Sequence, residues 1–315
     1  MVDLLRFAIK RVAWAIFVLF LVISGVFFLV RGIGDPARAR FGPQAQRSVI
    51  EAYRKQHGLD KPLIHQYGAY MSGLMRGDAG TARQTDLPVL EVIGSRLPRT
   101  LLLGAVAMAF ELCLGLTLGI IAAMYRNTWL DTGVMGLSFV GISAPTFLTG
   151  LLFLNWWAFR LGWFPVGGSG LGPRDELYHV ILPAFTLAIF GAATYARLMR
   201  GELIEKLQSD YVRTARAKGL NRIQVVVVHG ARNALLPIVT LMGLQLQTLV
   251  SGAIITETIY AYPGLGRLAW EALNSWDDTL ILGVTSISCA GVLIGNMLAD
   301  IGVASLDPRI RLNEG

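Results

Sequence analysis

Six long apolar stretches constrain the fold of this chain more than any other feature. Five carry no charged residue, and the sixth, Leu101–Tyr125, is interrupted only by Glu111. A bilayer core about 30 Å thick needs about 20 apolar residues in helical form, and helices satisfy the backbone polar groups of such segments within lipid. We therefore predict an all-α polytopic membrane protein with six transmembrane helices, the five uncharged stretches being Val12–Val30, Thr132–Phe159, Val180–Ala196, Asn233–Thr256 and Thr279–Ala299.

The charge content and the N-terminus support a membrane location. Charged side chains make up 16% of the chain, whereas soluble domains carry about 25%. The first stretch follows basic residues, as in a signal peptide. It is longer than a typical signal-peptide core, however, and Arg31-Gly32-Ile33-Gly34 follows it instead of a small-residue cleavage site. We predict that it is retained as a membrane anchor.

The distribution of Lys and Arg predicts the orientation. With the N-terminus inside, the cytoplasmic segments hold 14 Lys and Arg and the two short outer loops hold 3. The long loop after the first stretch is exempt from this rule because long loops translocate regardless of charge. Both termini are therefore predicted to be cytoplasmic. Topology also accounts for the sequence pI near 9.6, so we predict no nucleic-acid partner.

The segment at 32–97 is predicted to lie outside the cell. Gln44–His57 is expected to form a short helix, and Pro62 can open a second one that ends at Met75. The segment is too short to hold a hydrophobic core of its own.

The longest loop predicted on the cytoplasmic side, 197–232, has helical character. Glu202 and Lys206 are spaced as a helical ion pair that extends the preceding transmembrane helix. Ser209 is a suitable N-cap for a second short helix, Asp210–Lys218, and Gly219 a suitable stop.

This short helix has a basic surface with small residues between the charges. Its cations are Arg213, Arg216 and Lys218, and its small residues are Thr214, Ala215 and Ala217. Such a surface can dock another protein closely. A basic helix lying on anionic lipid is an equally good interpretation from these residues alone.

A few polar groups interrupt the apolar stretches. Glu111 is expected to face either a transport pathway or a hydrogen-bond partner on a neighbouring helix, because a charge at a helix centre costs about 2.5–3.5 kcal/mol. Gln245, Gln247 and Asn296 can line the pathway or join helices, and joining is the favoured interpretation.

Glycine and proline within the stretches predict helix packing and bending. Gly115 and Gly119 are four residues apart, as are Gly291 and Gly295, which allows close helix approach. Pro145 lies in the middle of its stretch, where a proline bends a helix; we expect a static kink rather than a hinge.

The chain lacks the patterns of known catalytic and metal sites. It has no nucleotide-binding P-loop, no H-E-x-x-H, no G-x-S-x-G, and its four His are scattered. Cys113 and Cys289 both fall inside apolar stretches, so no disulfide is expected. We predict no catalytic residue, no metal site and no cofactor in this chain.

A series of short motifs, in order along the chain, resembles the ABC importer permeases of the dipeptide/oligopeptide/nickel group, specifically the first (B-type) permease of each pair. The loop D-Y-V-R-T-A-R-A-K-G-L carries the resemblance most clearly. The other motifs are at His57–Tyr70, Arg76–Gly80, Arg96–Leu101, Leu161–Pro165, Tyr262–Leu268 and Leu306–Arg311. Each motif is weak, and the ordered set is specific.

The resemblance implies a type I importer permease in the bacterial inner membrane. Residues 1–31 would be an added transmembrane helix, 98–303 the permease core with five helices, and 304–315 a cytoplasmic tail. The implied partners are a second homologous permease, two ATPase subunits that bind ATP and Mg²⁺, an extracytoplasmic binding protein and the lipid bilayer. The implied ATPase-coupling residues are Asp210, Tyr211, Arg213, Thr214, Ala215, Arg216, Lys218 and Gly219.

The loop departs from the general importer pattern, in which Glu-Ala-Ala precedes a Gly by a fixed interval. Arg213, Thr214 and Ala215 occupy those positions, so the glutamate is absent. Docking is still implied, but individual contacts cannot be carried over.

Substrate and competing functions are only partly constrained. The resembled group handles di- and oligopeptides, with nickel, glutathione and oligosaccharides as alternatives, and we expect peptides. A secondary transporter would need more buried ionisable groups and inverted repeats, and an intramembrane enzyme would need a catalytic constellation.

Overall fold

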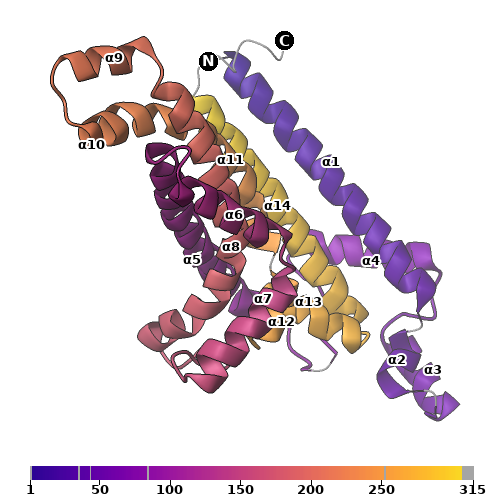
Figure 1. Ribbon diagram of the computed structural model, residues 1–315. Coiled ribbons are helices and arrows are strands. Elements are labelled where there is room, and N and C mark those ends of the chain that lie inside the picture. Colours follow the sequence, from indigo (N-terminus) through magenta and orange to yellow (C-terminus); the bar gives the residue numbers. More distant parts are fainter. Residues whose placement is uncertain (1, 35, 43, 84, 252, 307–315) are drawn as a thin grey trace. The chain divides into compact units, whose positions relative to one another are not determined.

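The computed structural model describes residues 2–34, 36–42, 44–83, 85–251 and 253–306, and nearly all of its regular structure is helical (Figure 1). Within these residues the β structure consists of one isolated antiparallel bridge between Thr81 and Pro88. The all-α prediction is confirmed. The chain folds into two compact units: Met1–Thr100, Val250–Ile254 and Pro263–Met297 form the first, and Leu101–Leu249, Ile255–Tyr262 and Leu298–Gly315 form the second.

The first unit combines the N-terminal helices with α13 and most of α14. Its core is a cluster of small and branched apolar side chains at the start of α5 and in α13 and α14, including Val89, Ile93, Leu268 and Val284. The helices that begin or lie in this unit are α1 (Val2–Ile33), α2 (Pro36–Phe41), α3 (Arg47–Gln56), α4 (Leu63–Met75), α5 (Val89–Met124), α13 (Leu265–Asn274) and α14 (Asp278–Leu306).

Both outer-segment helices predicted from sequence are present. The helix expected at Gln44–His57 is α3, which begins three residues later, and the helix opened by Pro62 is α4. Pro62 has φ −53° and immediately precedes the first helical residue, as expected of a residue whose ring fixes φ.

The second unit holds the remaining helices around an apolar core. That core includes Tyr195, Met199, Leu203 and Ile238, all buried. The helices are α6 (Trp129–Ser143), α7 (Thr146–Phe153), the π-helix η1 (Leu154–Arg160), α8 (Pro173–Lys206), α9 (Asp210–Ala217), α10 (Arg222–Gln224), the π-helix η2 (Val225–Ala231), α11 (Arg232–Ser251) and α12 (Ile254–Ile259).

Four helices are long and apolar enough to cross a membrane without interruption. They contain the stretches Arg11–Gly32, Val89–Met124, Pro173–Lys206 and Asp278–Met297. Two further apolar stretches are bent: Trp129–Ser143 meets Thr146–Arg160 at 104°, and Val225–Leu235 meets Pro237–Gly243 at 44°. The described residues therefore give four to six candidate spans, and six only if each bent pair is one span.

Pro145 breaks its stretch rather than kinking it, which corrects the sequence expectation. The chain leaves the helical conformation at Ala144 (ψ 124°) and Pro145 (ψ 130°). A proline disfavours the helical region for the residue before it. The Pro145 carbonyl then accepts the amides of Leu148 and Thr149 and starts α7.

Candidate functional site

Helix α9 forms where the sequence predicts it, and it ends one residue earlier, at Ala217. The carbonyl of Ser209 accepts the amides of Val212 and Arg213 at 3.2 and 3.3 Å, so Ser209 occupies the N-cap position. Its hydroxyl instead donates to the carbonyl of Lys206 at 2.5 Å and ties the new helix to the end of α8. Gly219 has φ +81°, the left-handed conformation that stops a helix, as predicted.

One face of α9 is buried against the segment that follows it. Val212 and Ala215 are 0% and 5% exposed and form a small core with Val225 of η2. Ala215, which the sequence analysis placed on the open surface of this helix, is therefore covered by the protein itself. In Figure 1 the α9–α10 segment projects beyond the ends of α8 and α11.

The other face of α9 is open. Asp210 and Arg213 form an exposed pair, with Oδ1 and Nη1 3.3 Å apart. The described exposed side chains of the predicted coupling set are Asp210, Tyr211, Arg213, Thr214 and Lys218, and the side chain of Arg216 lies outside the described residues.

Helix α8 continues to Lys206, and a turn of three residues connects it to α9. Lys206 Nζ lies 3.9 Å from Glu202 Oε2, the predicted helical pair, and 2.9 Å from Glu205 Oε1. The helix η2 packs closely on the end of α8, since a Cβ at Gly230 of η2 would lie 2.8 Å from Leu203 of α8. The end of α8, the turn and η2 therefore form one packed support for α9.

The glycine pair in α5 permits a very close contact with α8. A Cβ at Gly115 would lie 2.8 Å from the carbonyl oxygen of Ala192, and one at Gly119 would lie 2.7 Å from that of Ala196. Real Cβ atoms do not approach backbone this closely. The predicted close approach of helices is confirmed for this pair.

Of the four polar residues predicted inside the membrane, two meet α8. The Glu111 carboxylate lies against Gly191, where it fills the space that a Cβ would occupy. The Tyr195 hydroxyl donates to Gln245 Oε1 at 2.7 Å, which joins α8 to α11. The side chain of Gln247 lies outside the described residues, and Asn296 is half-buried in α14. Their part in a transport pathway remains a prediction.

An ion pair that was not predicted from the sequence joins α6 to α8. Arg200 Nε and Nη2 donate to the two carboxylate oxygens of Asp131 at 2.5 and 2.7 Å. In the sequence, Asp131 immediately precedes the apolar stretch Thr132–Phe159, and Arg200 lies in the predicted cytoplasmic loop 197–232. They are 69 positions apart, and no spacing rule relates them.

A second missed cluster lies in the first unit. Asp278, at the start of α14, pairs with Arg31 Nε at 2.8 Å and also with the Arg83 guanidinium. Asp277 Oδ2 accepts the amide of Arg83 at 2.5 Å. These bonds join the end of α1, the loop after α4 and the start of α14.

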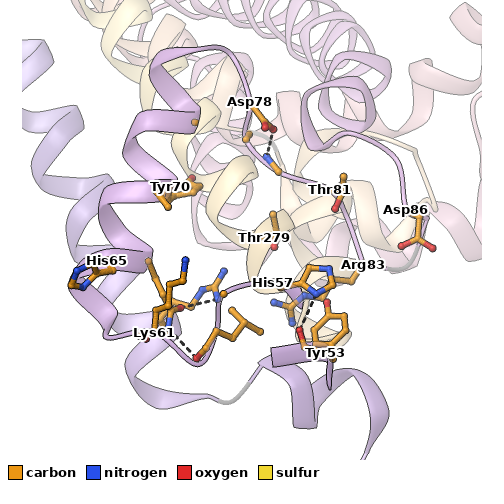
Figure 2. A pocket seen from close by; sticks show the side chains of 18 residues that line it. Tyr53, His57, Lys61, His65, Tyr70, Asp78, Thr81, Arg83, Asp86 and Thr279 are labelled. Atoms are coloured by element: carbon orange, nitrogen blue, oxygen red, sulfur yellow. Dashed lines mark hydrogen bonds between the residues drawn. The ribbon is translucent and has the colours of Figure 1, made fainter. Parts of the chain in front are cut away.

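A cavity of about 600 Å³ opens beside this cluster. In Figure 2, Tyr53 and His57 lie on one side of it, and Thr81 and Asp86 come from the loop that precedes α5. Tyr70 of α4 also lines it and contacts Ser286 at 3.5 Å. Burial raises the pKa of the Tyr70 hydroxyl, although Ser286 and Arg31 oppose the shift. The Tyr70 hydroxyl therefore stays protonated at neutral pH.

These features together define a helical, multi-spanning membrane protein that presents a short supported helix, α9, between two of its membrane segments. Within the described residues no group of three or more His, Cys, Asp or Glu could hold a metal ion.

Comparison with known proteins gives the family. Residues 115–312 match the family described as "Binding-protein-dependent transport system inner membrane component", and residues 4–104 match the N-terminal membrane component of the same systems. The chain belongs to this family: it is a permease subunit of an ABC importer, a multi-pass protein of the bacterial inner membrane.

Individual relatives agree with this assignment. The chain is 40% identical over 309 residues to the glutathione transport system permease protein GsiC of Escherichia coli K12, covering 98% of this chain and 99% of that protein. The GsiC of Shigella flexneri is 39% identical over the same length. A solved chain of the inward-facing MetNI methionine ABC transporter has a TM-score of 0.54 at 18% identity, covering 69% of this chain and 97% of that one. The MetNI likeness confirms the type I importer permease fold.

Proposed function

We propose that this permease imports short peptides of the glutathione class, delivered by an extracytoplasmic binding protein. The observation that carries the proposal is the 40% identity to a glutathione permease across 98% of the chain. The ordered peptide-group motifs agree with it, since glutathione is itself a tripeptide. Nickel and oligosaccharide are less well supported alternatives.

The substrate proposal is tested with the whole transporter. The chain, the second permease, the ATPases and the binding protein encoded with them are reconstituted in proteoliposomes containing ATP. Uptake of labelled glutathione is then measured against unlabelled dipeptides, oligopeptides, nickel and oligosaccharide as competitors. We expect labelled glutathione to be taken up and a short peptide to compete with it. Competition by nickel or oligosaccharide alone would contradict the proposal.

We further propose that α9 is the docking helix for one ATPase subunit. Its inner face is fixed on Val225, and its outer face offers Tyr211, Arg213 and Lys218 on a segment that projects from the bundle. A rigidly supported projecting helix can carry a displacement into the membrane, whereas a helix bound only to lipid needs no such support. In this proposal the ATPases hydrolyse ATP, and this chain contributes no catalytic group.

Charge reversal tests the docking proposal. Arg213→Glu replaces an exposed cation, 76% accessible, without touching the buried face of α9. We expect less ATPase subunit to co-purify with the permease while its level in the membrane stays unchanged. Arg76→Glu, at an exposed position after α4, is the matched control and should retain the ATPases. Equal recovery with Arg213→Glu and wild type would overturn the assignment of α9.

A further inference from the structure

The Asp131 carboxylate holds two parts of the structure at once. It accepts hydrogen bonds from Nε and Nη2 of Arg200, a contact that we call the fork, and it also accepts the amide of Asn127 at 2.9 Å. Asp131 is the third residue of α6, so its bond to Asn127 fastens the loop before that helix. Asn127 has φ +64°, a conformation uncommon outside glycine that this bond helps to hold.

The carboxylate end of the pair is shielded from water, and the guanidinium end is partly exposed. The side chains of Asp131 and Arg200 are 5% and 27% exposed. An ion pair of this kind loses most of its Coulombic gain to desolvation, and apolar residues of similar volume often hold two helices equally well. A forked guanidinium–carboxylate contact adds direction, because two parallel bonds fix both the angle and the register of the groups.

The other contacts between α6 and α8 do little to fix the register of the two helices. Gly141 of α6 packs on Ile189 and Ala193 of α8, at 3.2 and 3.3 Å from an added Cβ. Farther along, the Arg197 guanidinium lies 5.4 Å from the centroid of the Phe139 ring. Apolar packing is non-directional, so the Asp131–Arg200 fork is suited to setting the register of α6 along α8.

The pair also lies close to α9. Arg200 precedes the last residue of α8 by six positions, about 9 Å along the helix. After a three-residue turn the chain enters α9, which is fixed to α8 and η2. A displacement of α9 must therefore move the end of α8, and the fork transfers that movement to the start of α6.

We propose that Asp131 and Arg200 are positioning residues that couple the displacement of α9 to α6, and hence ATP hydrolysis to substrate movement. The proposal rests on the proposed docking of an ATPase on α9. Without the fork, α8 slides past α6 and hydrolysis proceeds without transport. As a pair that acts through the two helices it joins, it sets the number of substrates moved per ATP, and its loss lowers that number.

The experiment uses the complete reconstituted transporter and measures ATP hydrolysis and substrate uptake in the same vesicles. Arg200→Lys keeps the charge and removes the fork, and the double variant Asp131→Leu with Arg200→Met replaces the pair by apolar side chains. We expect each to keep ATP hydrolysis near the wild-type rate and to lower uptake per ATP by about tenfold. Glu202→Gln, which weakens the longer pair with Lys206 on the same helix, is the control and should keep the wild-type ratio.

A wild-type ratio of uptake to hydrolysis in the apolar double variant would overturn the proposal, because helix packing alone would then suffice. Equal loss of both activities in Arg200→Lys and in the double variant would also overturn it and assign the pair a purely structural role. Failure of ATPase docking on α9 is detected separately by the Arg213→Glu co-purification, which leaves the Asp131–Arg200 pair intact.

Discussion

At the scale of single residues, the first unit depends on a carboxylate shared by two guanidinium groups. Asp278 is 5% exposed and pairs with Arg31 and Arg83, which approach from α1 and from the loop before α5. Removing one partner of a buried ion pair costs about 3–5 kcal/mol, because charge is left in the interior without compensation.

Asp278→Asn keeps the volume of the side chain and removes its charge, so we expect it to destabilise the protein by about that amount. The measurement is the midpoint of thermal or chemical unfolding of the purified transporter in detergent. Asp60→Asn is the matched control, since Asp60 is exposed in the turn before α4. An unchanged midpoint for Asp278→Asn would mean that the two arginines are satisfied elsewhere.

Two glycines near α9 should respond in opposite directions to the same substitution. Gly219 has φ +81°, and an alanine held there costs about 1–2 kcal/mol even though the space around it is open. Gly201 lies inside α8 with nothing near its Cβ position, so Gly201→Ala should stabilise the helix by about 0.5–1 kcal/mol. Unfolding midpoints of the two variants check the difference. Equal shifts would mean that Gly219 leaves the left-handed region at little cost.

At the scale of helices, the α5–α8 contact depends on the absence of side chains. Gly119→Ala would place a Cβ 2.7 Å from both the Ala196 carbonyl oxygen and Met199 Cβ. The helices must then separate, and overpacking of this kind costs about 1–3 kcal/mol. We expect a lower unfolding midpoint.

Gly94→Ala provides the control on the same helix, because nothing lies within 4 Å of its Cβ position. It should be neutral or slightly stabilising. If Gly119→Ala behaves like Gly94→Ala, the close contact between α5 and α8 is not a feature of the folded protein.

Elements whose signals are local could be predicted from the sequence. The apolar stretches, α3, α4 and α9 each rest on composition, capping residues or helical spacing within a few turns. The sequence predicted a kink at Pro145, and the structure has a break. Whether a proline bends a helix or ends it depends on tertiary contacts that restore the helix beyond it, and the local sequence does not encode those contacts. The exposed cations Arg213 and Lys218 of α9 were predicted, but the burial of Ala215 was not. Ala215 packs on Val225, a contact that depends on the fold of the following segment.

Contacts between distant residues could not be predicted in this way. Asp131 and Arg200 have ordinary neighbours, and each alone is the kind of charge that ends an apolar stretch. The Asp278 cluster draws on three segments, with Arg31 52 positions before Arg83 and Asp278 195 positions after it. In both cases the physical cause is the tertiary arrangement of helices, so a single sequence gives no signal for the pairing.

At the scale of the whole molecule, the number of membrane crossings depends on the bent pairs. Four helices are unbroken candidates, and the pair that meets at Pro145 turns by 104°. If this pair is one broken span, the loop that follows it lies outside the cell. If it re-enters on the same side, that loop lies inside, and the span α8 then places α9 outside the cell. The excess of Lys and Arg, 14 against 3, favours the broken span with both termini inside.

Cysteine labelling distinguishes these topologies. Cys113 and Cys289 are first replaced by alanine, and single cysteines are introduced as Asp60→Cys, Leu171→Cys and Arg213→Cys, all at exposed positions. Leu171, after the bent pair, is 95% exposed. In intact spheroplasts, a membrane-impermeant maleimide should label positions 60 and 171, and position 213 should react only after permeabilisation. Labelling of 60 and 213 but not of 171 would make α6, α7 and η1 a re-entrant segment, and labelling of 213 alone in intact spheroplasts would reverse the orientation. Because α9 must lie in the cytoplasm to dock an ATPase subunit, either result would also remove the basis for ATPase coupling through this chain.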